Sequence, residues 1–161
     1  MMQQVTIPAI TVRYPWSWAI AEGVKQVENR GRAWHHRGRI AVHAAGALDV
    51  AAFRDARILA AEQHAQADGR IHAEGLRDPG VRVIGAIVAV ADLVDCHRAR
   101  HAGEGVCCAP WGDADGSRYA TAWHLCLSNV IRLDQPIDCL GAQGMWWPRP
   151  SIQDQLQAVG G

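Results

Sequence analysis

Hydrophobic residues occur in short runs along the chain, and glycine, proline and polar residues separate these runs. Four segments show the alternation or the β-branched enrichment that predicts strands: residues 4–13, 37–45, 81–97 and 121–133. In the second of these, Ile40 and Val42 fall on one side of the strand, while Ala41 and His43 fall on the other. These runs predict a sheet that contributes most of the core.

Two segments have helical periodicity. The first begins at a proline in a favourable first helical position, places Trp16, Ala19 and Ile20 on one face, and is expected to end at Gly23. The second, residues 47–66, is rich in alanine and carries an apolar stripe, which predicts a longer helix.

The order of these elements predicts an α+β domain with a small closed or half-closed sheet and flanking helices. Residues 24–30 are expected to form a strand or an extended turn. Residues 98–118 have the composition of a loop insert, and the chain after residue 133 is interrupted by proline and glycine. We therefore expect a single domain spanning residues 1–161.

Length and composition agree with this expectation. The chain has 161 residues, of which 49% are hydrophobic and 20% charged, as is typical of soluble globular proteins. No apolar run reaches the roughly 18–20 residues needed to span a bilayer. The N-terminus lacks the basic and apolar segments of a signal peptide, so we expect a cytoplasmic protein without a membrane partner.

The charge is balanced overall but uneven locally. The formal net charge is zero, yet residues 25–39 hold five of the 16 lysines and arginines against one acid, Glu28. Lys25 is the only lysine of the chain, and Trp34 lies within the same stretch. Cations interspersed with an aromatic residue suit a phosphate backbone and a stacked base, although a solvated cationic hairpin has the same composition.

The five cysteines suggest reduced thiols more than a metal site. Cys107 and Cys108 are adjacent, and Cys96, His97 and His101 precede them, which raises the question of zinc. However, the chain has no CxxC or HxxxH pair with a matching second half, and short structural sites usually show such pairs. From the sequence we expect neither a metal nor a cofactor.

One motif is specific enough to suggest a family. The segments YPWSWAIAEGVKQVENR, RGRIAVHAA, GAIVAVADLVDC and WHLCLSNVIRLDQPIDCLGAQGMW together resemble the ASCH domain, the activating-signal-cointegrator homology domain. The most characteristic part is a G-x-K-x-x-E-x-R string, which consists of Gly23, Lys25, Glu28 and Arg30. The resemblance runs from about Ile7 to Trp147 and excludes the 98–118 insert.

The resemblance implies a PUA-like β-barrel with a cleft beside the first helix, in which RNA or a modified nucleobase binds. Some similar proteins cleave RNA, and a small bacterial branch hydrolyses N4-acetylated cytidine with a lysine, a threonine three residues later and an acid on a later strand. Lys25 matches that lysine and Asp92 falls at the acid. Glu28 stands where the threonine would be, so the nucleophile of that branch is missing.

The chemistry of these residues also supports a binding site. A desolvated lysine can act as a base or as a point-charge donor, whereas arginine retains its proton. If Lys25 and Glu28 converge in a turn, Asp92 could complete an acid–lysine–acid cluster that grips the edge of a base. Arg30 would then face phosphate or a planar partner. The alternative for Lys25, Glu28 and Arg30 is an exposed ion-pair ladder.

Aromatic and histidine side chains add further candidates. Trp16 and Trp18 are about 200° apart on a helix, so one is expected in the core and the other in the cleft, with Trp16 the better core candidate. His43 either contacts a ligand or is a satisfied core histidine. Backbone contacts are expected from three arginines: Arg32, Arg37 and Arg39.

Three functions follow from these observations. The first is binding of RNA or a nucleobase through Trp16 or Trp18, Lys25, Glu28 and Asp92. The second is metal-independent hydrolysis of RNA or of an acylated nucleoside, with Lys25, Glu28 and Asp92 as catalytic residues. The third is a protein–protein adaptor, which an exposed apolar patch around Trp111 would favour.

Overall fold

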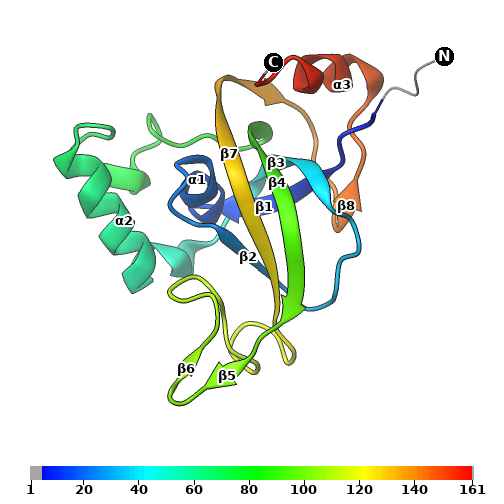
Figure 1. Cartoon of the computed structure of the whole chain (residues 1–161). Helices are drawn as coiled ribbons and strands as arrows, with labels where there is room; N and C mark the ends of the chain where they lie inside the picture. Colours follow the sequence, from blue (N-terminus) through cyan, green and yellow to red (C-terminus); the bar gives the residue numbers. More distant parts are fainter. Residues whose placement is uncertain (1–4, 161) are drawn as a thin grey trace.

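The computed structural model describes residues 5–160 and has a mixed six-stranded sheet with three α-helices, an α+β architecture (Figure 1). The sheet strands are β1 (Ala9–Tyr14), β2 (Val27–Arg30), β3 (Gly38–Leu48), β4 (Ala86–Arg98), β7 (Trp123–Asp138) and β8 (Met145–Trp146). The helices are α1 (Trp16–Ala21), α2 (Ala56–Ala67) and α3 (Pro150–Gln157), with 3₁₀ turns η1 (Val50–Arg54) and η2 (Gly75–Arg77). The α+β class expected from the order of elements is thus confirmed.

The sheet has the strand order β2-β7-β4-β3-β1-β8. β1 and β3 are parallel, and every other neighbouring pair is antiparallel. Within the described chain the edge strands β2 and β8 do not pair with each other, so the expected closed barrel is not confirmed. Long strands β4 and β7 pair over most of their length, with register shifts between Ile87 and Ala89, Val90 and Asp92, and Leu93 and Asp95.

The main core lies between the sheet and α1, and every residue of α1 is buried. Ile40 and Val42 of β3 belong to this core, whereas Ala41 belongs to a second, smaller core that Ile152 and Leu156 of α3 cover. The prediction that Ile40 and Val42 face one side of this strand and Ala41 the other is therefore confirmed. α2 lies outside α1, so α1 is enclosed between the sheet and α2 (Figure 1).

The expected helix over residues 47–66 begins too early. β3 continues to Leu48, which pairs with Tyr14, and two aspartates then divide the segment. The side chain of Asp49 accepts a hydrogen bond from the backbone N–H of Ala52 at the start of η1, and that of Asp55 accepts one from Arg57 at the start of α2. Each aspartate is an N-cap, and the alanine-rich composition concealed the break between them.

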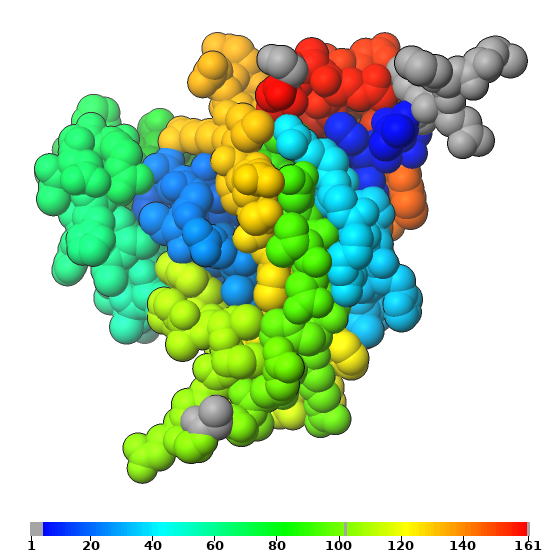
Figure 2. All heavy atoms as spheres, in the orientation of Figure 1, coloured from blue at the N-terminus to red at the C-terminus, as the bar shows by residue number. Residues whose placement is uncertain are grey.

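Two other segments differ from expectation. The proline-rich end contains α3, with Pro150 at a favoured position in its first turn. The 98–118 segment contains a short hairpin of β5 (His101–Ala102) and β6 (Gly105–Val106), which projects from the end of the molecule opposite α3 (Figure 2). Among residues 5–160, none of the helices is long and apolar enough to cross a membrane.

Gly23, which was expected to end the first helix, allows a test of the fold. Gly23 has a φ of +75°, and an added Cβ would meet nothing within 4 Å, so substitution there introduces backbone strain without a clash. We expect Gly23→Ala to lower the free energy of unfolding by about 1–2 kcal/mol. Gly46→Ala, also in open space but without a positive φ, is the control and should cause no loss. Equal losses in urea denaturation would contradict the assignment of Gly23 as a conformational stop.

Candidate functional site

The end of α1 places Lys25 inside the protein. The backbone N–H groups of Val24 and Lys25 both donate to the carbonyl of Ala19, which fixes the chain as it leaves the helix. The Lys25 side chain is only 2% exposed, and its Nζ donates to the Val27 carbonyl and to Glu28 Oε2, the latter at 2.8 Å. The structure thus brings together Lys25, in the irregular segment before β2, and Glu28, in β2, and the pair is not an exposed ladder.

Arg30 extends this pair into a three-residue network. Its Nε lies 3.4 Å from Glu28 Oε1, and its Nη2 donates to the Thr11 carbonyl at 2.9 Å. The guanidinium also lies over the indole of Trp34, 5.4 Å from the ring centroid. Glu28 therefore lies between two cations, and the planar partner expected for Arg30 is supplied by the protein itself.

Burial and charge oppose each other in this network. Burial lowers the pKa of Lys25 below the ordinary lysine value, and the neighbouring Glu28 carboxylate opposes that shift. Burial raises the pKa of Glu28, but the charges of Lys25 and Arg30 outweigh it and bring the pKa below that of an ordinary glutamate. Glu28 is consequently a carboxylate at neutral pH, and its charge is what makes a buried ammonium tolerable.

A pocket of about 410 Å³ opens beside Lys25 and Glu28. We define the pocket by its main polar and aromatic lining: Trp16, Lys25, Glu28, Asn29, Asp49, Asp55, Arg57, Asp113 and Arg118. Trp16 comes from α1, the next three from β2 and the segment before it, and the remainder from η1, α2 and the chain before β7. The pocket therefore combines three separate parts of the sequence around one indole ring.

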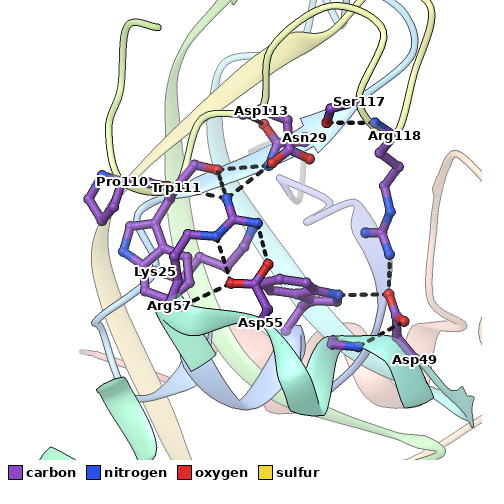
Figure 3. Close-up of polar contacts among 12 residues, drawn as sticks. Lys25, Asn29, Asp49, Asp55, Arg57, Pro110, Trp111, Asp113, Ser117 and Arg118 are labelled. Carbon is purple, nitrogen blue, oxygen red and sulfur yellow. Dashed lines mark hydrogen bonds and ion pairs between the residues drawn. The ribbon is translucent and has the colours of Figure 1, made fainter. Parts of the chain in front are cut away.

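Arg57 organises one wall of the pocket (Figure 3). Its guanidinium donates to Asp55 Oδ2 at 2.8 Å and to Asp113 Oδ1 at 3.0 Å, and it lies 5.2 Å from the Trp16 ring centroid. Asn29 joins the same wall, because its Nδ2 donates to the Trp111 carbonyl and its Oδ1 accepts from the Asp113 backbone N–H, both at 2.9 Å. These contacts attach the 107–122 segment to β2 and α2.

Asp49 and Arg118 close the opposite wall of the pocket (Figure 3). Asp49 Oδ2 accepts from Trp16 Nε1 at 2.8 Å and from the Arg118 guanidinium, which also lies 5.7 Å from the Trp16 ring centroid. Burial raises the pKa of Asp49, but the hydrogen bond from Trp16 and the charge of Arg118 lower it below the usual aspartate value. Trp16 is thus held by its polar edge while its ring faces cationic side chains.

A larger cleft of about 1,040 Å³ adjoins the pocket. We define the cleft by these lining residues: Thr11, Arg13, Trp16, Glu28, Arg30, Arg32, Trp34, His43, Arg118, Tyr119 and the loop 140–144. Trp16, Glu28 and Arg118 line both the cleft and the pocket. The lining contains four arginines and one acid, so it is strongly cationic although the whole chain is neutral.

Two side chains of the cleft have buried polar atoms without a hydrogen-bond partner among the described residues. His43 Nε2 lies 2.9 Å from the Cys139 carbonyl, so this nitrogen carries the proton and Nδ1 is an acceptor. Among the described residues, neither His43 Nδ1 nor Trp34 Nε1 has a hydrogen-bond partner. Buried polar atoms normally have partners, so these two are unusual. Both are covered by protein, and Gly141 packs against the His43 ring, so a ligand reaches them only if the loop 140–144 moves.

Two sequence-predicted residues lie elsewhere. Trp18, not Trp16, faces away from the site and lines a separate hollow with Tyr14 and Val88. Asp92 pairs with Arg39 at 3.7 Å and accepts from Asn129 at 2.9 Å, and it is not among the residues that line the pocket or the cleft. β7 lies between β4, which carries Asp92, and β2, which carries Glu28, so Asp92 does not join the expected cluster.

The arginines expected to bind a backbone divide into two groups. Arg32 is exposed and lines the cleft. Arg37 lies 3.8 Å from Asp95 and donates to the Trp34 carbonyl, while Arg39 pairs with Asp92, and neither lines the cleft. The structure therefore does not group these three arginines into one strip.

Sequence reasoning missed the residues that complete the pocket. Asp49 and Asp55 were hidden inside the expected helix, although an aspartate before an apolar run is an N-cap signal. Arg57, Asp113 and Arg118 have no local motif, since each reaches the site only through long-range packing. The pocket wall comes from the segment that the sequence presents as a loop insert.

The buried pair predicts a large cost for removing Lys25. Lys25→Met leaves Glu28 buried with only Arg30, so we expect a loss of about 3–5 kcal/mol in the free energy of unfolding. Lys25→Met combined with Glu28→Gln should recover part of that loss. Arg98→Met, which removes an exposed pair with Asp115, should cost no more than about 1 kcal/mol. Equal losses for Lys25→Met and Arg98→Met in chemical denaturation would contradict the buried network.

His43 predicts a pH dependence. Burial lowers the pKa of His43, and the hydrogen bond to Cys139 only partly opposes this. In the unfolded chain His43 has a pKa of about 6.5 and binds a proton as the pH falls below that value. In the folded chain the lower pKa keeps His43 neutral, so stability falls as pH decreases. His43→Gln should flatten the stability profile between about pH 7 and pH 5. An unchanged slope in that variant would show that His43 does not contribute.

Comparison with known proteins agrees with the resemblance at the level of the fold. No protein-family model and no curated protein matches the sequence. The crystal structure of ASCH from Zymomonas mobilis matches 96% of this chain and 95% of its own, with a TM-score of 0.54 and 14% sequence identity. A tyrosine-to-phenylalanine mutant of that protein matches 96% of this chain and 99% of its own, with a TM-score of 0.53 and 14% identity. The chain therefore has the fold of an ASCH domain.

Proposed function

We propose that the chain binds single-stranded RNA, with the backbone in the cleft and one base, unmodified or modified, in the pocket. The observation that carries this proposal is the continuity of the two cavities. Trp16, Glu28 and Arg118 line both, so a cationic surface leads directly to a polar pocket with an indole wall. Proteins that bind single-stranded nucleic acids combine a positively charged groove for the backbone with aromatic side chains on which bases stack.

The cleft has the chemistry to bind a phosphate backbone. Arg13, Arg32 and Arg118 are exposed and Arg30 is partly buried, and Glu28 is the only acid of the lining. Trp34 and Tyr119 add aromatic surface. Affinity from such a surface depends on salt, because each phosphate contact releases condensed counterions.

The pocket has the size and polarity for a base. Its volume lies within the range of about 300–1,000 Å³ common for small-ligand sites. Asn29 and Asp113 offer acceptors, and Lys25 and Arg57 offer donors, which are the groups that read the edge of a base. Stacking on Trp16 requires Arg118 to move from the ring, and its side chain is 41% exposed, so it has room to do so.

The alternatives have weaker support. For hydrolysis of RNA or an acylated nucleoside, Lys25 would have to act as a base, but its ammonium already donates to Glu28 and Val27, and Asp92 lies outside the pocket. For the adaptor, Trp111 is buried against Arg57 and offers no exposed apolar patch. Binding without turnover is the function that the pocket supports best.

The experiment compares two pairs of arginines of equal charge. Arg13→Gln with Arg32→Gln removes two cations of the cleft, whereas Arg37→Gln with Arg39→Gln removes two that pair with acids outside it. In fluorescence anisotropy with a labelled single-stranded RNA, the first variant should bind more weakly. The slope of log affinity against log salt should fall in magnitude by about 1.4, for two lost contacts at about 0.7 each.

The second variant is the matched control and should retain both affinity and salt slope. A loss in Arg37→Gln with Arg39→Gln, and not in the cleft variant, would contradict the proposed binding surface. Competition by a panel of unmodified and modified nucleosides then tests the pocket. If the pocket binds a base, at least one nucleoside should displace the labelled RNA; if the protein binds only the backbone, none should.

A further inference from the structure

Four metal-ligand side chains converge outside the pocket and the cleft. His97 lies near the end of β4, Cys107 and Cys108 follow β6, and His124 lies at the start of β7. One potential ligand atom from each lies within 4.8 Å of all the others. His124 is fully buried and the other three are partly buried, so the group is partly shielded from solvent.

The distances within the group match a tetrahedral metal site. Cys107 Sγ lies 3.6 Å from His97 Nε2 and 3.4 Å from His124 Nδ1, and Cys108 Sγ lies 3.4 Å from His97 Nε2. Zinc binds thiolate sulfur at about 2.3 Å and imidazole nitrogen at about 2.0–2.1 Å, so a tetrahedron has sulfur–nitrogen edges of about 3.5 Å. These three edges fit this geometry, and the other ligand atoms of the group lie within 4.8 Å of one another.

Both imidazoles are held in the tautomer that a metal requires. His97 Nδ1 lies 2.6 Å from Asp95 Oδ2, and His124 Nε2 lies 2.9 Å from the Asp113 carbonyl. Each of these nitrogens donates to its oxygen, so the lone pair of the other nitrogen faces the two cysteines. Histidines that bind metals almost always have such a carboxylate or carbonyl partner.

The backbone around the cysteines is shaped to bring both sulfurs to one point. Cys108 has a φ of +62°, an uncommon conformation for a residue other than glycine. The Arg100 backbone N–H donates to Cys107 Sγ at 3.2 Å. A Cβ on Gly112 would lie 2.4 Å from the Cys107 carbonyl and 2.6 Å from His124 Cε1, so only glycine permits this approach.

We propose that His97, Cys107, Cys108 and His124 bind a structural zinc ion. A set of two thiolates and two imidazoles is typical of zinc, and four protein ligands leave no position for water or substrate, so the ion stabilises the fold and takes no part in chemistry. This proposal departs from the expectation of no metal. That expectation rested on the absence of a CxxC pair, whereas the turn at Cys108 lets adjacent cysteines bind the same ion.

The ion would secure the wall of the pocket. Its ligands join β4 and β7 to the start of the 107–122 segment, and His124 also binds the Asp113 carbonyl. Asp113 is the residue that Arg57 and Asn29 hold against the pocket. Loss of the ion should therefore loosen the part of the chain that carries Trp111 and Arg118.

The test measures metal in the whole chain, purified without a polyhistidine tag. Mass spectrometry of metal content should find about one zinc per chain, and cobalt(II) reconstitution should give the visible bands of a tetrahedral site with thiolate charge transfer. Cys107→Ser and Cys108→Ser should each abolish stoichiometric zinc, and Cys139→Ser, whose thiol lies outside the group, should retain it. Asp95→Asn should weaken zinc binding by about 10–100-fold.

Several outcomes would overturn the proposal. One is a wild-type chain that binds neither zinc nor cobalt, or that carries a disulfide between Cys107 and Cys108. Another is loss of zinc in Cys126→Ser with retention in Cys108→Ser, since Asp95, His97 and Cys126 form an alternative group. If the cysteine variants do not fold, proteolysis of the wild type decides: a chelator should expose the 107–122 segment to cleavage, and unchanged protection would contradict the site.

Discussion

The site depends on a single buried charge balance, in which Glu28 lies between Lys25 and Arg30. A lysine that is 2% exposed is costly unless an anion compensates it, and Glu28 supplies that anion at 2.8 Å. The turn after α1 brings the two residues together, and β2 then directs Arg30 toward Trp34 and the cleft. Arginine would bring a larger, planar head group into this space, so the compact ammonium of the chain's only lysine suits this position.

The rest of the pocket is assembled around this network by segments far apart in the sequence. Trp16 occupies the centre, with Asp49 on its indole nitrogen and three cations near its ring. The 107–122 segment completes the wall through Asn29 and Arg57. The proposed zinc site lies at the base of the same segment, so a long irregular loop would gain the rigidity that a binding surface needs.

Sequence reasoning succeeded where the information was local. Strand alternation located β3, the glycine after α1 marked the end of that helix, and the ASCH-like string found the Lys25–Glu28 pair. The sequence analysis favoured Trp16 as the core residue, but Trp16 lines the pocket and Trp18 does not. The spacing of two tryptophans on one helix shows that they face different sides, and it does not show which side faces the site. The place of Asp92 depends on strand order, and the convergence of the proposed zinc ligands depends on one unusual φ. Local sequence patterns reveal neither of these features.

The most direct test of this account uses the fact that the chain has one lysine. With lysine labelled in ¹³C and ¹⁵N, NMR gives one set of side-chain signals, which reports on the pocket alone. Titration with a single-stranded RNA that binds the protein should shift the Cε and Nζ signals of Lys25, and a nucleoside that competes with the RNA should also shift them. RNA binding that leaves both signals unchanged would contradict the proposal that a base enters the pocket beside Lys25.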